Sequence, residues 1–386
     1  MTDAKRERTV DYDIHGLLGL RALSPPPALA REIARQMDPL RPTALTAAPD
    51  ISLTPFHDDS GAKMAYELGD AGDSQHSTFE WPDFWLSNDK KMLRIPFLSI
   101  GTGETCDIRY APGIGFRRMF LNYVRPLLQL SLPSKGAAAV HSAAVSYKGQ
   151  GLIFAGWAES GKTEAALGFI RHGATFVSDK WSILTEAGDT VYNFPTPITI
   201  RGWMLRYLPA LAQGLPPVHR WRVRAATVLA ATVDGTSDSS IPLARRLSNA
   251  VSPAVSLGTR ASVTASQLFG HPKGHGRAER MSPSAPLAKL FLLMTSNRGI
   301  SVSRADLDEV ASRLVDCAEY ERRGVLGLYK RFRYAYPNTR SPAIEEAPER
   351  ERGVLKKALG SKEVFLVEAP FPFDPEAIFN AISPHC

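Results

Sequence analysis

The spacing of apolar and polar residues predicts little regular structure at the start of the chain. Apolar positions at helical intervals predict a short helix over 25–37, because Ser24 can cap its first turn and Pro25 can occupy that turn. Residues 38–62 are rich in Pro, Ala and Asp, and no ordered element is predicted in them. We therefore expect residues 1–76 to form a partly disordered N-terminal extension.

Strand-like patterns follow this extension. Three runs rich in aromatic and aliphatic residues predict a small antiparallel sheet, and they lie at 79–86, 92–100 and 106–111. Apolar residues between Phe116 and Leu128 then recur at helical spacing, with a kink expected at Pro126. The sheet and this helix define a second segment, 77–135.

From residue 138 onward, short strands alternate with helices. The expected elements are strands at 138–147, 151–156 and 174–179, a helix at 162–172 that ends at Gly173, a hairpin at 180–194 and a strand at 197–201. The same alternation resumes near the C-terminus, with a strand at 287–294 and a helix at 305–323. We expect residues 136–386 to form an α/β domain with a mixed α+β sheet.

A long segment interrupts this domain. Residues 206–280 are rich in Pro, Ser, Ala and Arg, and a strand pattern occurs only at 261–269. We predict a partly helical insertion here. The total of 386 residues is enough for about two domains, in agreement with this division.

The charge of the chain does not indicate a specific nucleic-acid site. It has 46 basic and 39 acidic residues and a net charge of +7, but the basic residues are spread along the sequence. The densest basic clusters, 322–333 and 273–280, match no nucleic-acid-binding signature. A basic face that attracts phosphorylated or acidic ligands is the interpretation we favour, and a nucleic-acid-linked ATPase is the alternative that charge alone suggests.

Other compositional features predict a cytoplasmic protein without a membrane partner. Apolar runs such as 290–294 are far shorter than the roughly 20 residues of a membrane span, and no export signal precedes the first element. Three cysteines lie far apart without paired spacing, which is typical of reduced thiols.

One short segment suggests chemistry, because it matches the phosphate-loop pattern GxxxxGK[ST] between a predicted strand and a predicted helix. Its residues are Gly156, Trp157, Ala158, Glu159, Ser160, Gly161, Lys162 and Thr163. Backbone N–H groups of such a loop, together with the helix N-terminus, bind phosphate. Lys162 would reach the β and γ phosphates of ATP, and the Thr163 hydroxyl would ligate Mg²⁺. An ordinary strand-to-helix turn is the alternative.

Phosphoryl transfer also needs a carboxylate near the metal and the acceptor hydroxyl. Asp179 is the candidate for both roles, since it follows the apolar end of the next predicted strand. His141, in the strand before the loop, could hydrogen-bond to Asp179 if their strands are neighbours. The alternatives are that Asp179 caps a turn and that His141 is structural.

Residues 140–184, which contain this histidine, the phosphate loop and the segment FVSD, resemble the catalytic core of the HPr kinase/phosphorylase family and its relatives. Residues 198–205 are similar to a second signature of that family around Ile-Arg-Gly, and the similarity is fainter at 285–293 and 367–378. The resemblance implies a fold like that of phosphoenolpyruvate carboxykinase, with ATP and Mg²⁺ as cofactors and a serine hydroxyl as acceptor. It also implies that Lys162 and Thr163 hold phosphate and metal, and that Asp179, with His141, serves the acceptor proton.

The chain departs from the family pattern at two positions. Lys180 and Thr199 stand where that pattern has acids, so we expect an acceptor other than HPr and no reverse phosphorolysis. The expected activity is transfer of the γ-phosphoryl group of ATP to a hydroxyl of a peptide, a protein or a small molecule, in a biosynthetic setting. The alternative is a catalytically impaired nucleotide-binding regulatory protein. A homo-oligomer is left open.

Overall fold

The computed structural model describes residues 8–56, 66–70, 73–80, 83–88, 91–111, 114–201, 217, 221, 260–269 and 281–386. The insertion predicted at 206–280 lies outside the described residues, except for its positions 217, 221 and 260–269. Together, the described elements form a mixed α+β structure whose sheets contain both parallel and antiparallel pairs.

The first half of the chain forms an eight-stranded sheet with the order β1-β2-β3-β8-β7-β6-β5-β4. Its strands are β1 (Thr9–Ile14), β2 (Leu18–Leu23), β3 (Ile51–Pro55), β4 (Tyr66–Asp70), β5 (Asp73–Glu80), β6 (Asp83–Asn88), β7 (Lys91–Ile95) and β8 (Cys106–Tyr110). β8 matches the strand predicted at 106–111, and β7 matches the first part of the one predicted at 92–100. The single strand predicted at 79–86 is wrong, because it covers the end of β5 and the start of the antiparallel β6. β3 joins both β2 and β8 in parallel.

Two N-terminal expectations are therefore wrong. The prediction of no ordered element in 38–62 missed β3, whose Ile51 and Leu53 are fully buried in the sheet. The boundary expected at residue 76 falls inside β5, because hydrogen bonds run through one sheet from β1 to β4. The predicted N-terminal helix is present as α1 (Pro27–Met37), which buries Leu29, Ile33 and Met37.

A helical segment connects the two halves of the chain. It consists of α2 (Phe116–Met119), the π-helical turn η2 (Phe120–Val124), α3 (Arg125–Ser131) and η3 (Pro133–Lys135). The 3-10 turn η1 (Phe97–Ser99) lies earlier, between β7 and β8. Pro126 lies inside a continuous helical stretch, 116–131, where it has no N–H to donate to the preceding turn. The irregularity expected at Pro126 is instead the π-helical turn that precedes it.

The second half forms a nine-stranded mixed sheet. Its main path is β12-β10-β11-β17-β14-β13-β9, and β19 joins β17 to β18. The strands are β9 (Ala137–Val140), β10 (Ser142–Tyr147), β11 (Gln150–Ala155), β12 (Thr175–Ser178), β13 (Ser182–Thr185), β14 (Thr190–Asn193), β17 (Ser284–Thr295), β18 (Ser301–Arg304) and β19 (Glu363–Ala369). A two-stranded sheet of β15 (Ile198–Arg201) and β16 (Arg260–Val263) lies beside it.

The single strand predicted at 138–147 is divided at His141. β9 pairs with β13, whereas β10 pairs with β11 and β12, so the chain changes partner strands at this residue. The polar pair His141-Ser142 interrupts the apolar run 137–145 at the break, but both side chains are buried like the strands on either side.

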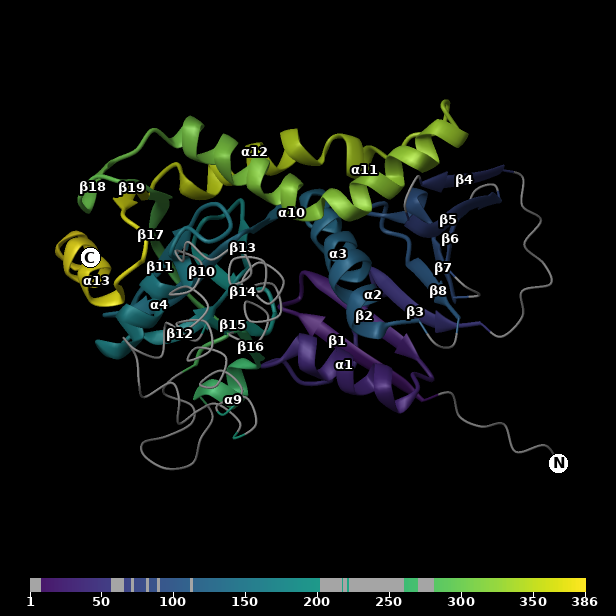
Figure 1. The fold of residues 1–386 in the computed structure, drawn as a ribbon, viewed down its shortest axis with the longest axis horizontal. Coiled ribbons are helices and arrows are strands. Elements are labelled where there is room, and N and C mark those ends of the chain that lie inside the picture. The colour runs from purple at the N-terminus through teal and green to yellow at the C-terminus, as the bar shows by residue number, and fades with distance from the viewer. Residues whose placement is uncertain are drawn as a thin grey trace, which may run out of the picture.

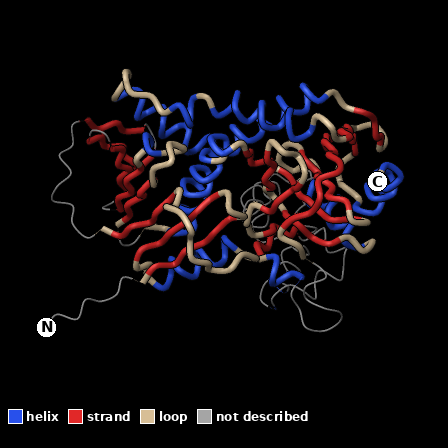
Figure 2. Tube along the Cα trace, turned by 180° about the vertical axis from the view of Figure 1, so that it is seen from behind, coloured by secondary structure: helices blue, strands red, loops and turns tan. Residues whose placement is uncertain are grey.

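Helices cover these sheets. They are α4 (Lys162–Arg171), α9 (Ala265–Phe269), α10 (Leu307–Ala335), α11 (Pro342–Glu345), α12 (Ala347–Leu359), α13 (Pro375–Ile382) and η4 (Ser383–His385). Figures 1 and 2 show α10, α11 and α12 running along one side of both sheets. None of the described helices is long and apolar enough to span a bilayer.

The helix α10 is longer than predicted and packs against both halves. Its first half buries Val310, Leu314 and Val315 in the core of the second sheet. Its second half enters the N-terminal core, where the rings of Tyr329 and Phe97 have centroids 5.4 Å apart. The helix therefore packs into two separate hydrophobic clusters, one at each of its halves.

Candidate functional site

The strand directions of the second sheet bring several loops to one edge. β11 and β12 both run antiparallel to β10, so they end at the edge where β10 begins. β17 runs parallel to β11, and β19 runs parallel to β17. The carboxyl ends of β12, β11, β17 and β19 thus meet the start of β10, which is the kind of edge where α/β sheets bind ligands.

The candidate phosphate loop follows β11 at this edge, and its two glycines are required by close contacts. Gly156 has φ +145°, and a Cβ there would lie 2.4 Å from the Leu293 carbonyl oxygen. Gly161 has φ +92°, and a Cβ there would lie 3.0 Å from the Phe373 ring. Any larger residue would displace the loop at both positions.

The loop presents several unpartnered polar groups. Gly161 precedes α4, and no side chain caps the first turn of this helix. The Ser160 hydroxyl is buried and lacks a hydrogen-bond partner among the described residues. Free N–H groups at a helix N-terminus and a buried unpaired hydroxyl both suit a bound anion.

Lys162 is folded back onto the loop. Its ammonium group donates a 2.9 Å hydrogen bond to the Gly156 carbonyl and a second one to the Trp157 carbonyl. Burial lowers the pKa of Lys162, although Cys317 and Asp179 act in the opposite direction. Since an ammonium group has three N–H donors, one remains for a phosphate oxygen.

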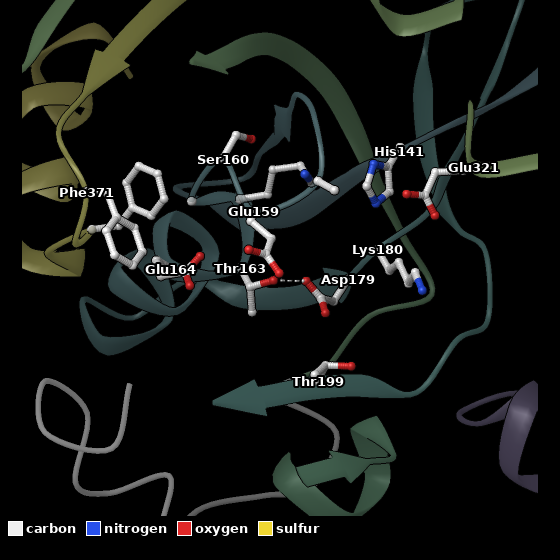
Figure 3. Close-up of a pocket in the computed structure, with 14 residues that line it drawn as sticks. His141, Glu159, Ser160, Thr163, Glu164, Asp179, Lys180, Thr199, Glu321 and Phe371 are labelled. Atoms are coloured by element: carbon white, nitrogen blue, oxygen red, sulfur yellow. Dashed lines mark hydrogen bonds between the residues drawn. The ribbon is translucent and has the colours of Figure 1, made fainter. Parts of the chain in front are cut away.

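Thr163 and Asp179 are in direct contact. The Thr163 hydroxyl donates a 2.8 Å hydrogen bond to Oδ1 of Asp179, drawn as a dashed line in Figure 3. Asp179 is buried, and this burial raises its pKa, while the bond from Thr163 and the charges of Lys162 and Lys180 lower it. Asp179 comes directly after β12, and its contact with Thr163 places it beside the first turn of α4.

His141 lies at the same edge, but its observed partner is not Asp179. Its Nδ1 lies 3.2 Å from the Cys317 sulfur, and its ring centroid lies 5.1 Å from that of Trp181. Burial, together with the charges of Lys162, Lys180 and Arg125, lowers its pKa to about 2. His141 is therefore neutral at pH 7, and no hydrogen bond to Asp179 occurs among the described residues.

A cavity of about 230 Å³ joins these groups. Besides His141, Lys162, Thr163 and Asp179, its walls include Ala158, Glu159, Ser160, Gly161, Glu164, Lys180, Thr199, Glu321, Phe371 and Phe373. Trp157 instead extends toward α10, where its ring centroid lies 4.7 Å from that of Tyr320. In Figure 3, Phe371 lies at one end of the cavity, and His141, Lys180 and Glu321 lie at the other.

Sequence reasoning missed several residues of this site. Glu321 lies one helical turn after Cys317 on α10, a spacing that places both on one face, but no motif marked it. Phe371 and Phe373 lie within the segment 367–378, which resembled the kinase family only faintly. Arg125, a buried charged residue in a predicted apolar helix, does not line the cavity itself.

The donor set fits Mg²⁺ better than a metal held entirely by protein. No group of three or more His, Cys, Asp or Glu side chains suited to a metal ion occurs in the described part of the chain. One hydroxyl and one carboxylate, Thr163 and Asp179, are hydrogen-bonded to each other within the cavity. Such a small set matches Mg²⁺, which keeps several waters and binds substrate phosphates as well.

Comparison with protein-family models finds no match for this chain, and comparison with curated proteins finds none that is significantly similar.

Proposed function

We propose that this protein is an ATP-dependent phosphotransferase that transfers the γ-phosphoryl group to a hydroxyl of a peptide, a protein or a small molecule. The observation that carries the proposal is the hydrogen bond between Thr163 and Asp179 in the cavity of the phosphate-loop segment. It unites the hydroxyl of the loop motif with a buried carboxylate, the two groups that phosphoryl transfer needs beside the phosphates.

We further infer a catalytic fold like that of the HPr kinase/phosphorylase family. The support is the resemblance of residues 140–184 together with the observed order of strand β11, loop, helix α4 and strand β12. The mixed sheet is compatible with this inference.

Each polar residue of the cavity would have its own role in phosphoryl transfer. Bound Mg·ATP supplies the phosphoryl group and neutralises part of its charge. Lys162 would hold phosphate oxygens through its remaining N–H donor, and Thr163 and Asp179 would be metal ligands. Asp179 would also accept the acceptor proton, a role that its raised pKa favours. Neutral His141 would orient groups by hydrogen bonding, since it carries no charge at pH 7.

A catalytically impaired nucleotide-binding regulatory protein is the second candidate function. The observation that favours it is that Lys180 and Thr199 both line the cavity, where the related kinases have acids. Such a protein would bind Mg·ATP without transferring phosphate.

The two candidates differ in a direct assay. Purified protein is incubated with γ-labelled ATP, Mg²⁺ and a panel of serine peptides and small hydroxyl compounds, and nucleotide binding is measured separately by calorimetry. Binding together with labelled product that is lost in Asp179→Asn supports the phosphotransferase. Binding without any product supports the regulatory protein, and no binding contradicts both.

A further inference from the structure

The end of the cavity opposite Phe371 carries positive charge that the phosphate-loop motif does not explain. Lys180 lines the cavity next to Asp179, and its side chain forms no ion pair or hydrogen bond with any described residue. Figure 3 shows it on the side of His141 and Glu321, away from Glu164. A cation in this position faces the space beside the candidate base.

The backbone at Lys180 is strained in a way that lysine does not favour. Its φ is +73°, in the left-handed region that Gly, Asn and Asp adopt far more readily than other residues. Gly, Asn or Asp at position 180 would adopt this backbone conformation at a lower energy cost than lysine. Strain of this kind is common where a side chain has a functional role.

Arg125 is a second cation near Lys180, although it does not line the cavity. It is the first residue of α3 and is only 6% exposed, and its Nε and Nη1 atoms are buried without a hydrogen-bond partner in the described part of the chain. Its charge lowers the pKa of both Lys180 and His141, so it lies close to both. A buried guanidinium with unused donors is costly unless an anion satisfies it.

Glu321 is the acid that faces these cations. It lines the cavity from α10 and acts on the pKa of both Arg125 and Lys180, but it lies within ion-pair distance of neither. The carboxylate therefore balances part of the charge and leaves the Lys180 ammonium group, which lines the cavity, without a partner. A ligand that carries its own anionic group could pair with it, while Arg125 adds positive charge nearby.

We propose that Lys180, supported by Arg125, forms an anion subsite that binds a carboxylate or phosphate group carried by the hydroxyl acceptor. This inference rests on the proposed function, since it assigns the acceptor class for the same cavity. The acceptor is then an anionic hydroxyl compound or a serine beside an acidic group. Its hydroxyl would lie toward Asp179, with its anion toward Lys180.

Binding measured without turnover tests this subsite. Protein saturated with Mg²⁺ and a non-hydrolysable ATP analogue is titrated with inorganic phosphate and, separately, with acetate, by calorimetry. Lys180→Asn removes the charge and suits the left-handed backbone. Lys148→Asn is the matched control, because Lys148 also has positive φ, at +51°, but lies in an exposed turn between β10 and β11.

We expect Lys180→Asn to weaken anion binding about tenfold, with Lys148→Asn equal to wild type and analogue affinity unchanged. Arg125→Met should weaken it as well. Because Asn relieves the strained backbone, the melting temperature of Lys180→Asn should also rise. Equal anion affinity in wild type and Lys180→Asn overturns the subsite, as does a wild type that binds neither anion.

The same design separates this inference from the proposed function. If the ATP analogue does not bind to wild type, the proposed function fails. The subsite is then tested by titrating Lys162→Ala with the same anions in the absence of nucleotide. In the labelled-ATP assay, glycerol 3-phosphate, glycerate and paired serine peptides with acidic or neutral neighbours identify the source of the anion. Preferred transfer to the neutral members of this set would contradict the proposal.

Discussion

Thr163 and Asp179 are joined by a hydrogen bond of 2.8 Å, although they are sixteen positions apart and belong to different elements. Thr163 lies in the first turn of α4, and Asp179 follows β12. The contact arises because β11 and β12 run in the same direction on either side of β10. The hydrogen bond joins the two proposed metal ligands, and each of them can be substituted without changing the other.

Lys162→Ala should abolish productive ATP binding. The variant loses the N–H donor that we assign to the phosphates and a positive charge buried in the loop, and the Kd should rise by roughly 10- to 100-fold or more. Calorimetric titration with Mg·ATP measures the effect, with Lys148→Ala as the control for a loss of surface charge. Wild-type affinity in Lys162→Ala would exclude the phosphate-loop interpretation.

Asp179→Asn should separate binding from chemistry. The amide keeps the size of the side chain and can still accept a hydrogen bond from Thr163, but it is neither a base nor a strong metal ligand. We expect nucleotide affinity within about tenfold of wild type and transfer slower by about 10²–10⁴. A parallel loss of both, with a lowered melting temperature, would mean that Asp179 serves the fold.

The sequence was sufficient to predict most strands and the residues of this loop, because turn residues and buried strands have clear local patterns. It could not predict that Glu321 lines the cavity from α10, since that contact depends on how helices pack across two sheets. The division of the strand at His141 was hidden for a related reason. Both sides of the break are buried and apolar, and the polar pair His141-Ser142 between them is too short to predict a turn.

His141 should make the protein less stable in acid. Its pKa is about 2 in the folded state against the ordinary 6.5, so the unfolded chain binds a proton that the folded chain does not between these values. The stability associated with neutral His141 is therefore present above about pH 6.5 and is lost as the pH falls, by up to about 1.4 kcal/mol per pH unit. Urea unfolding of wild type and His141→Gln at pH 7.5 and 5.5 measures this loss.

In His141→Gln the difference between the two pH values should become smaller, since glutamine does not titrate. The exposed His172→Gln serves as the control variant. An unchanged pH dependence in His141→Gln would show that His141 is accessible to protons in the folded protein.

The buried ion pair between α10 and α12 should be sensitive to loss of one partner. Arg322 donates a 2.6 Å hydrogen bond to Glu351, and their side chains are 1% and 2% exposed. Arg322→Met should cost about 3–5 kcal/mol of unfolding free energy, because it leaves a buried carboxylate unpaired. Adding Glu351→Leu should restore most of that loss, as denaturant titrations can show. A double variant no more stable than Arg322→Met would contradict this explanation.

The helix α10 sets a constraint on how the length of this chain can change. This helix of 29 residues carries Glu321 at the cavity and Cys317 against His141, and it carries Tyr329 and Phe332 in the N-terminal core. Inserting or deleting one residue between these two groups would turn one of them by about 100° relative to the other. Substitutions at the exposed positions between them are harmless by comparison. Exposed positions of α10 can therefore be substituted, whereas the number of residues between these two groups must stay the same.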